Sequence, residues 1–155
     1  ANDNADGQAV LSGDRAAVEM ACAVAKEKGA KRAMLLQVSA PFHCRLMGPA
    51  AERLAAALAT TTFTAPARPV IANVTAEPVS DPALLPDLLT RQVTARVRWR
   101  ETMQNLAAGD TRLIAEFGAG KVLPGLARRA VPGAALFNIQ GPDDLDGLVQ
   151  ALQAG

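Results

Sequence analysis

Residues 111–139, TRLIAEFGAGKVLPGLARRAVPGAALFNI, decide the expected fold because strand-forming and helix-forming sequence alternate within them. The apolar segments 111–117 and 134–139 have the length and composition of strands. A glycine loop between them leads into a predicted short helix that ends near residue 130. Strands separated by helices favour a parallel sheet covered on both faces. This stretch therefore predicts an α/β fold.

The rest of the chain continues this alternation. Over 15–30, Ala17, Met20 and Val24 recur at helical spacing and Gly29 supplies a stop, so these residues predict a helix. Further helices are expected over 45–63, 81–93, 98–109 and 142–155, and strands over 9–14, 32–39 and 69–76. We expect the chain to leave a small α/β layer near Ser39. Because the predicted first strand follows directly on a turn-rich start, more chain is expected to precede it.

Composition narrows the range of functions. Lysine plus arginine total 16 against 15 acidic residues, which leaves no basic field for nucleic acid and no polybasic segment for a membrane surface. No apolar run approaches the roughly 20 residues that span a bilayer, and the polar start is unlike a signal peptide. The two cysteines, Cys22 and Cys44, and the one histidine cannot supply a four-ligand zinc site without carboxylates. We therefore expect no metal, free thiols and a cytoplasmic location.

The only histidine, His43, lies between the predicted strand 32–39 and the predicted helix 45–63. In open α/β sheets, ligands bind beyond the carboxyl ends of strands, where such loops converge. One interpretation is a partly buried histidine whose ring nitrogens bond to backbone groups. The other is a general base for a nucleophile, provided that another group holds the second ring nitrogen. The residues alone leave both interpretations open.

Three further motifs favour structural explanations. Cys44 follows His43 directly, and adjacent residues at a helix start point in different directions, so we expect a packed thiol rather than a dyad. The loop EFGAGKVL has Val122 where a phosphate-binding P-loop has serine or threonine after the lysine, so a structural loop is expected. Three aspartates fit a negatively charged first helical turn better than a cation site; they are Asp143, Asp144 and Asp146.

Five sequence blocks, in their order and spacing, resemble bacterial malonyl-CoA:acyl-carrier-protein transacylases of fatty acid synthesis. They are NDNADGQAVLSGD, GAKRAMLLQVSAPFHCRLMGPAAERL, RPVIANVTAEPV, RQVTARVRW and EFGAGKVLPGLARR. The resemblance covers essentially the whole chain and implies roughly the carboxy-terminal half of the acyltransferase domain. It implies part of a small ferredoxin-like subdomain over residues 1–39. Residues 40–155 would form the carboxy-terminal part of an α/β hydrolase-like large subdomain with a parallel sheet.

The resemblance also implies an activity, that of a malonyl-CoA:acyl-carrier-protein S-malonyltransferase. In this family a serine in a GxSxG elbow takes malonyl from coenzyme A and passes it to the phosphopantetheine thiol of acyl carrier protein. His43 would be the catalytic base, and the backbone carbonyl of Gln92 would orient its ring. Asn2 and Asn4, in the turn expected before the first strand, would face the entrance for coenzyme or carrier protein. Phe42 beside the base would crowd a branched acyl group and favour malonyl over methylmalonyl.

The chain departs from the family pattern in what it lacks. No GxSxG motif occurs in its 155 residues, and Ser12 and Ser39 do not lie in an elbow. The serine and the arginine that pairs with the malonyl carboxylate would belong to a missing amino-terminal half, so this chain alone is expected to be inactive. No permanently bound cofactor is expected, because malonyl-CoA is a substrate. The alternatives are a thioester hydrolase of similar fold and a non-catalytic half-domain that binds a carrier protein.

Overall fold

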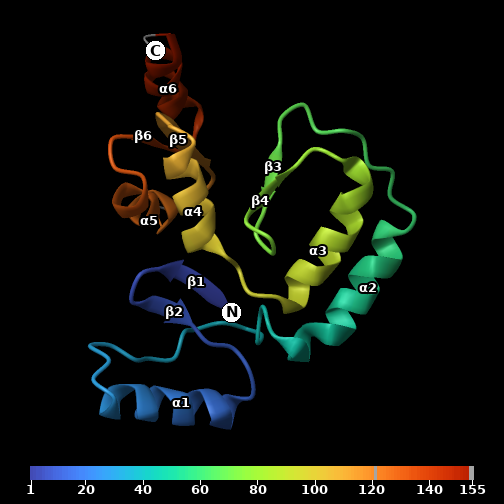
Figure 1. Ribbon diagram of the computed structural model, residues 1–155, viewed down its shortest axis with the longest axis vertical. Helices are drawn as coiled ribbons and strands as arrows, with labels where there is room; N and C mark the ends of the chain where they lie inside the picture. The colour runs from blue at the N-terminus through green and yellow to red at the C-terminus, as the bar shows by residue number, and fades with distance from the viewer. Residues whose placement is uncertain (121, 154–155) are drawn as a thin grey trace. The chain divides into compact units, whose positions relative to one another are not determined.

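The computed structural model describes residues 1–120 and 122–153, which form two compact units, residues 1–99 and residues 100–153 (Figure 1). The first unit contains the strands β1 (Asn2–Ala5), β2 (Gln8–Val10), β3 (Val70–Ala72) and β4 (Glu77–Val79) and the helices α1 (Arg15–Glu27), α2 (Gly48–Leu58) and α3 (Leu85–Thr94). The second contains α4 (Trp99–Ala108), which begins at the division, β5 (Leu113–Phe117), α5 (Val122–Ala130), β6 (Ala135–Ile139) and α6 (Leu145–Gln153). Short 3₁₀ turns precede α2, α3 and α6; they are η1 (Arg45–Met47), η2 (Pro82–Leu84) and η3 (Pro142–Asp144).

The second unit has the predicted strand, helix, strand order. β5 and β6 pair in parallel, in a register that runs from Leu113 opposite Ala135 to Phe117 opposite Ile139. The helix α5 connects the two strands and packs against both, and it buries Ala127 at 1% exposure. A parallel pair needs such a crossover, because its strands must start at the same end. The α/β prediction drawn from residues 111–139 is therefore confirmed within this unit.

The first unit begins with an antiparallel hairpin instead of the predicted strand over 9–14. β1 and β2 pair around a turn at Asp6 and Gly7, and Gly7 has a positive φ of 73°. The prediction that Asn2 and Asn4 lie in a turn before the first strand is therefore wrong, since both are strand residues of β1. Asparagine and aspartate are poor strand formers. Pairing with β2 overrides this local preference.

Residues 32–39 do not form the predicted strand. The segment is assigned to no strand in the described structure, and Met34, Leu36 and Val38 are 54%, 54% and 62% exposed. An apolar, strand-forming sequence becomes a strand only when a neighbour offers its backbone groups for pairing. No such neighbour is present among the described residues.

A second hairpin replaces the predicted single strand over 69–76. β3 and β4 are antiparallel, with Val70 opposite Val79, and the turn between them ends at Ala76. Ala76 combines a left-handed backbone, φ 60°, with only 1% exposure. Arg98 anchors this turn, because its backbone N–H donates to the Asn73 carbonyl at 3.0 Å and its Nη1 donates to the Thr75 carbonyl at 2.9 Å.

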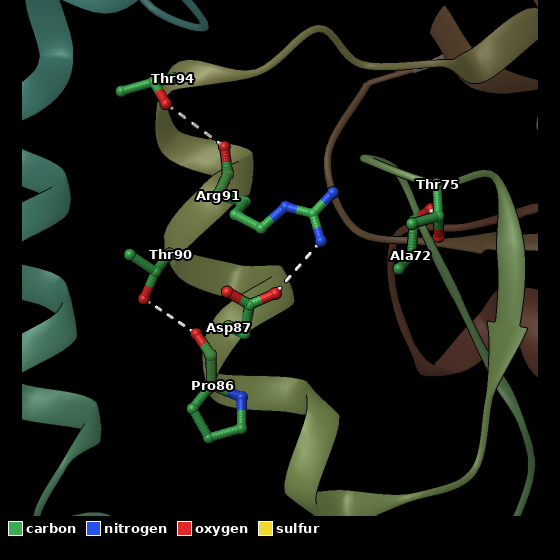
Figure 2. Close-up of polar contacts among 7 residues, drawn as sticks. All are labelled: Ala72, Thr75, Pro86, Asp87, Thr90, Arg91 and Thr94. Carbon is green, nitrogen blue, oxygen red and sulfur yellow. Dashed lines mark hydrogen bonds and ion pairs between the residues drawn. The ribbon is translucent and has the colours of Figure 1, made fainter.

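The helices α2 and α3 lie side by side in opposite directions, so that the start of α2 and the end of α3 meet at the same end of the pair (Figure 1). Figure 2 shows the polar contacts that support α3: Arg91 pairs with Asp87 one turn earlier, at 3.1 Å, and the Thr90 hydroxyl donates to the Pro86 carbonyl at 2.8 Å. Leu88 on the same helix is buried, at 8% exposure. An amphipathic pattern of this kind packs one helix face against a neighbour.

The helices predicted over 15–30, 45–63, 81–93 and 98–109 are confirmed, with ends that differ by a few residues. The helix predicted over 142–155 is confirmed as far as Gln153, and residues 154–155 lie outside the described residues. The fold is mixed α/β with small sheets. The boundary predicted near Ser39 falls inside the first unit, so the division into subdomains over 1–39 and 40–155 stays a prediction. None of the helices within 1–120 and 122–153 is both long enough and apolar enough to cross a membrane.

Candidate active site

The turn before α2 holds His43 in an unusual backbone conformation. Its φ is 58°, in the left-handed region that side chains other than glycine rarely adopt. Pro41 disfavours a helical conformation at Ala40, and the Phe42 N–H donates to the Ala40 carbonyl at 2.9 Å. Histidine tolerates this region better than most residues, yet such a conformation costs roughly 1–3 kcal/mol. This backbone strain lies at His43, the residue that the sequence marked as a candidate general base.

The imidazole of His43 meets the end of α3. Its Nδ1 lies 3.0 Å from the backbone oxygen of Gln92, a residue 49 positions later in the sequence. A carbonyl oxygen can only accept a hydrogen bond, so Nδ1 must bear the proton. In the neutral ring Nε2 then has the free lone pair. The contact therefore fixes one tautomer and leaves Nε2 able to accept a proton.

The Gln92 carbonyl is open to His43 because α3 ends two residues later. The last carbonyls of a helix have no amide one turn ahead to bond with. Ala95 is extended, with φ −96° and ψ 157°, and the helix stops at Thr94. The side chain of Gln92 closes this end, since its Nε2 donates to the Ala95 carbonyl at 3.1 Å.

The electrostatics of this helix end favour a positive ring. The carboxy-terminal end of a helix has a partial negative charge, and a cation placed there is stabilised by about 0.3–1 kcal/mol. The imidazolium formed when Nε2 takes a proton would lie at the end of α3.

Two further anchors hold the chain that follows α3. The Val97 N–H donates to the Ala1 carbonyl at 2.8 Å, and the Asp3 N–H donates to the Val97 carbonyl at 3.0 Å. Strand β1 therefore lies beside residue 97, and Asn2 is the bridge partner of Val97. This pairing places β1 close to the helix end that His43 contacts.

The structure brings together two of the five residues singled out from the sequence, His43 and Gln92. Phe42 is 45% exposed in the turn beside the imidazole. Asn2 and Asn4 are half-buried in β1. Within the described ranges, none of Phe42, Asn2 and Asn4 shares a hydrogen bond with the imidazole or with the Gln92 carbonyl.

The contribution of the Gln92 side chain is seen only in the structure. Its Nε2 is bonded to Ala95, whereas its Oε1 is buried with no hydrogen-bond partner in the described structure. Nothing in the sequence signals this, because an amide near a helix end is usually exposed and solvated. The carbonyl role of Gln92 came from the family resemblance alone.

The motifs given structural explanations make hydrogen bonds of their own. The Cys44 thiol donates to the Pro41 carbonyl at 3.2 Å, and both cysteines are free thiols. Asp144 accepts from the backbone N–H groups of Gln140 and Gly141 at the start of η3. Lys121 of the glycine loop is outside the described residues. Among residues 1–120 and 122–153, no group of three histidine, cysteine or carboxylate side chains could hold a metal ion.

Known proteins match this chain closely over most of its length. A malonyl CoA-acyl carrier protein transacylase from Salmonella typhimurium is 46% identical over 130 residues, 84% of this chain and 42% of the relative. The Bacillus subtilis transacylase is 38% identical over 153 residues, 99% of this chain and 48% of the relative. The chain therefore spans about half the length of the curated relatives it matches. No protein-family model matches it.

Solved structures agree with these relatives. An acyl-carrier-protein S-malonyltransferase from Bartonella henselae superposes with a TM-score of 0.93 at 48% identity, covering 99% of this chain and 49% of that one. A malonyl-transacylase solved in complex with a type II PKS acyl-carrier protein superposes with a TM-score of 0.84 at 34% identity, covering 99% of this chain and 49% of that one. Similarity at this level, in sequence and in backbone, leaves one conclusion: the chain belongs to the malonyl CoA-acyl carrier protein transacylases, of which it represents about half the length.

Proposed function

We propose that this chain is part of an enzyme that moves a malonyl group from malonyl-CoA to the phosphopantetheine thiol of acyl carrier protein. The names of its relatives support this substrate and this acceptor. The observation that carries the proposal is the contact of 3.0 Å between His43 Nδ1 and the Gln92 carbonyl. A ring held at Nδ1 and free at Nε2 has the arrangement that a general base for a nucleophile requires.

His43 would move one proton back and forth in two acyl transfers. In the first, Nε2 takes the hydroxyl proton of a serine while the serine oxygen attacks the malonyl thioester. The carbon–sulfur bond breaks, and the imidazolium returns the proton to the leaving coenzyme A thiolate. In the second transfer, Nε2 takes the proton of the phosphopantetheine thiol, which attacks the serine ester. The imidazolium then protonates the serine oxygen as it leaves.

The Gln92 carbonyl would serve where many related enzymes use a carboxylate. It accepts the Nδ1 hydrogen and so fixes the tautomer, as the aspartate of a catalytic triad does. It has a partial rather than a full negative charge, and the end of α3 adds to it. The imidazolium would therefore be stabilised without a buried acidic side chain.

The serine would come from a part of the enzyme that this chain does not contain. Its 155 residues include no GxSxG motif, and we infer that the missing amino-terminal half supplies the serine and the arginine for the malonyl carboxylate. The exposed apolar side chains at Met34, Leu36 and Val38 support this inference, because a strand-forming apolar segment is stable when another element covers it. This chain alone would then be inactive.

Selectivity and access are proposed for the remaining site residues. Phe42 would narrow the space beside the base and disfavour the extra methyl of methylmalonyl, by about 1–3 kcal/mol. Asn2 and Asn4 on β1 would face the entrance through which coenzyme A or the carrier protein arrives. We further propose a cytoplasmic location for the enzyme, which fits its free thiols.

A transfer assay with purified components tests the function. The completed enzyme, meaning this chain joined to an amino-terminal half that supplies the serine, is mixed with malonyl-CoA and acyl carrier protein. Malonyl-carrier protein formed by the completed enzyme, and none formed by this chain alone, is the expected result. Release of free malonate without carrier loading would instead identify a thioester hydrolase. Carrier binding with neither product would identify a binding half-domain.

A further inference from the structure

The side chain of Gln92 has a task distinct from that of its carbonyl. While the carbonyl accepts from His43, the side-chain Nε2 donates to the Ala95 carbonyl at 3.1 Å. Both bonds involve one residue, and they lie on either side of the point where α3 ends. Gln92 thus contacts the imidazole through its carbonyl and caps the end of α3 through its side chain.

The helix end decides whether the Gln92 carbonyl is open to the imidazole. If α3 continued by one more turn, the N–H of Arg96 would reach this carbonyl, since helical bonds join each amide to the residue four positions earlier. Ala95 prevents this through its extended backbone, ψ 157°. In that conformation its own carbonyl meets the amide of Gln92. The side chain therefore stabilises the conformation that leaves the Gln92 carbonyl to His43.

The unpaired oxygen of the same side chain argues against a role in stability alone. Gln92 Oε1 is buried without a partner in the described part of the chain, and a buried polar atom of this kind lowers stability. An apolar side chain of similar size would avoid that cost. The amide is better explained by the bond that its Nε2 donates.

We propose that the side chain of Gln92 is a positioning residue for the imidazole, acting through Ala95 on the availability of the Gln92 carbonyl. Its kinetic consequence rests on the proposed function, whereas its effect on the tautomer of His43 does not. Residues 95–98 keep their other anchors, Val97 on Ala1 and Arg98 on Asn73, when this side chain is changed. The perturbation should accordingly remain local.

The test compares three variants of the completed enzyme. Gln92→Met keeps the side-chain volume and the helix-forming tendency, but removes both the donor and the unpaired oxygen. Gln92→Glu keeps the shape and replaces the donor with a carboxylate oxygen. Thr90→Ala is the matched control, because it removes a side-chain bond to a backbone carbonyl on the same helix, at 2.8 Å, without touching Ala95.

Two readouts are measured for each variant. ¹⁵N NMR of the imidazole reports which ring nitrogen of His43 bears the proton, with the signals assigned by their loss in His43→Asn. Steady-state kinetics give kcat and the KM for malonyl-CoA. In the wild type and in Thr90→Ala we expect the Nδ1–H tautomer and the same kcat.

In Gln92→Met we expect a mixture of tautomers and a kcat about 3- to 10-fold lower, with KM within twofold and thermal stability unchanged or higher. A Gln92→Met protein with the wild-type tautomer and the wild-type kcat would overturn the inference. If that variant does not fold, Gln92→Glu is judged by the same two readouts. If the wild-type completed enzyme transfers no malonyl, the proposed function fails, and the tautomer measurement still decides this inference.

Discussion

Replacing His43 by asparagine should separate the chemistry of the imidazole from its effect on folding. Asparagine tolerates the left-handed backbone at this position, where φ is 58°, so the substitution adds little strain. It removes the hydrogen bond of 3.0 Å to the Gln92 carbonyl. Such a bond contributes about 0.5–1.5 kcal/mol, so the free energy of unfolding should fall by about 1 kcal/mol.

The loss of activity should be much larger than this loss of stability. A positioned general base contributes about 10²–10⁴ in rate, which corresponds to about 3–5 kcal/mol of barrier. The rate of serine acylation in the completed enzyme should therefore fall at least about 100-fold, while most of the protein stays folded. A nearby change, Cys44→Ala, serves as control because it removes only the thiol bond to Pro41.

Rapid mixing with malonyl-CoA, followed by acid quenching and mass measurement of the malonyl-enzyme, gives the acylation rate directly. Urea unfolding of the same preparations gives the change in stability. An acylation rate for His43→Asn within about threefold of the wild type, in a protein that is folded by the second measurement, would refute the assignment of His43 as base.

Three further predictions concern selectivity and stability. Phe42→Ala should raise the turnover of methylmalonyl-CoA relative to malonyl-CoA by about 5- to 150-fold, measured as a ratio of kcat/KM values, and an unchanged ratio would remove Phe42 from the selectivity argument. Ala76→Val should lower the free energy of unfolding in urea by about 2 kcal/mol or more, because a branched side chain suits neither a φ of 60° nor a site with 1% exposure, whereas Ala76→Gly should remain closer to the wild type. Arg98→Met should cost about 1.5–3 kcal/mol by the same measurement, because it removes the charged donor that holds the Thr75 carbonyl at 2.9 Å. A wild-type unfolding curve for Arg98→Met would show that the backbone bond to Asn73 holds the turn without the guanidinium.

Local signals in the sequence account for the helices and for the parallel pair. Periodic apolar residues and a terminal glycine predicted α1, and a proline and aspartates at the first turn predicted the terminal helix that contains α6. The strands β5 and β6 were predicted because each is a short apolar segment bounded by turn residues. These signals concern residues within one or two turns of each other, so one sequence is enough to detect them.

Pairing between strands could not be predicted in the same way. The hairpin of β1 and β2 puts Asn2 and Asn4 in a strand against their local preference, because backbone pairing with β2 and with Val97 outweighs it. Residues 32–39 show the opposite case. Their composition favours a strand, but they form none because no described neighbour pairs with them. In both cases the outcome depends on which backbone groups lie alongside.

The candidate site, too, could be predicted only in part from the sequence. Sequence alone marked His43 as a residue with a possible chemical role, and family resemblance named Gln92 as its partner. Only the tertiary structure brought them to 3.0 Å across 49 positions, by packing α2 and α3 in opposite directions and ending α3 at Thr94. It also gave the Gln92 side chain its bond to Ala95. A hydrogen bond between residues far apart in the chain depends on how whole helices pack, and no local propensity encodes that packing.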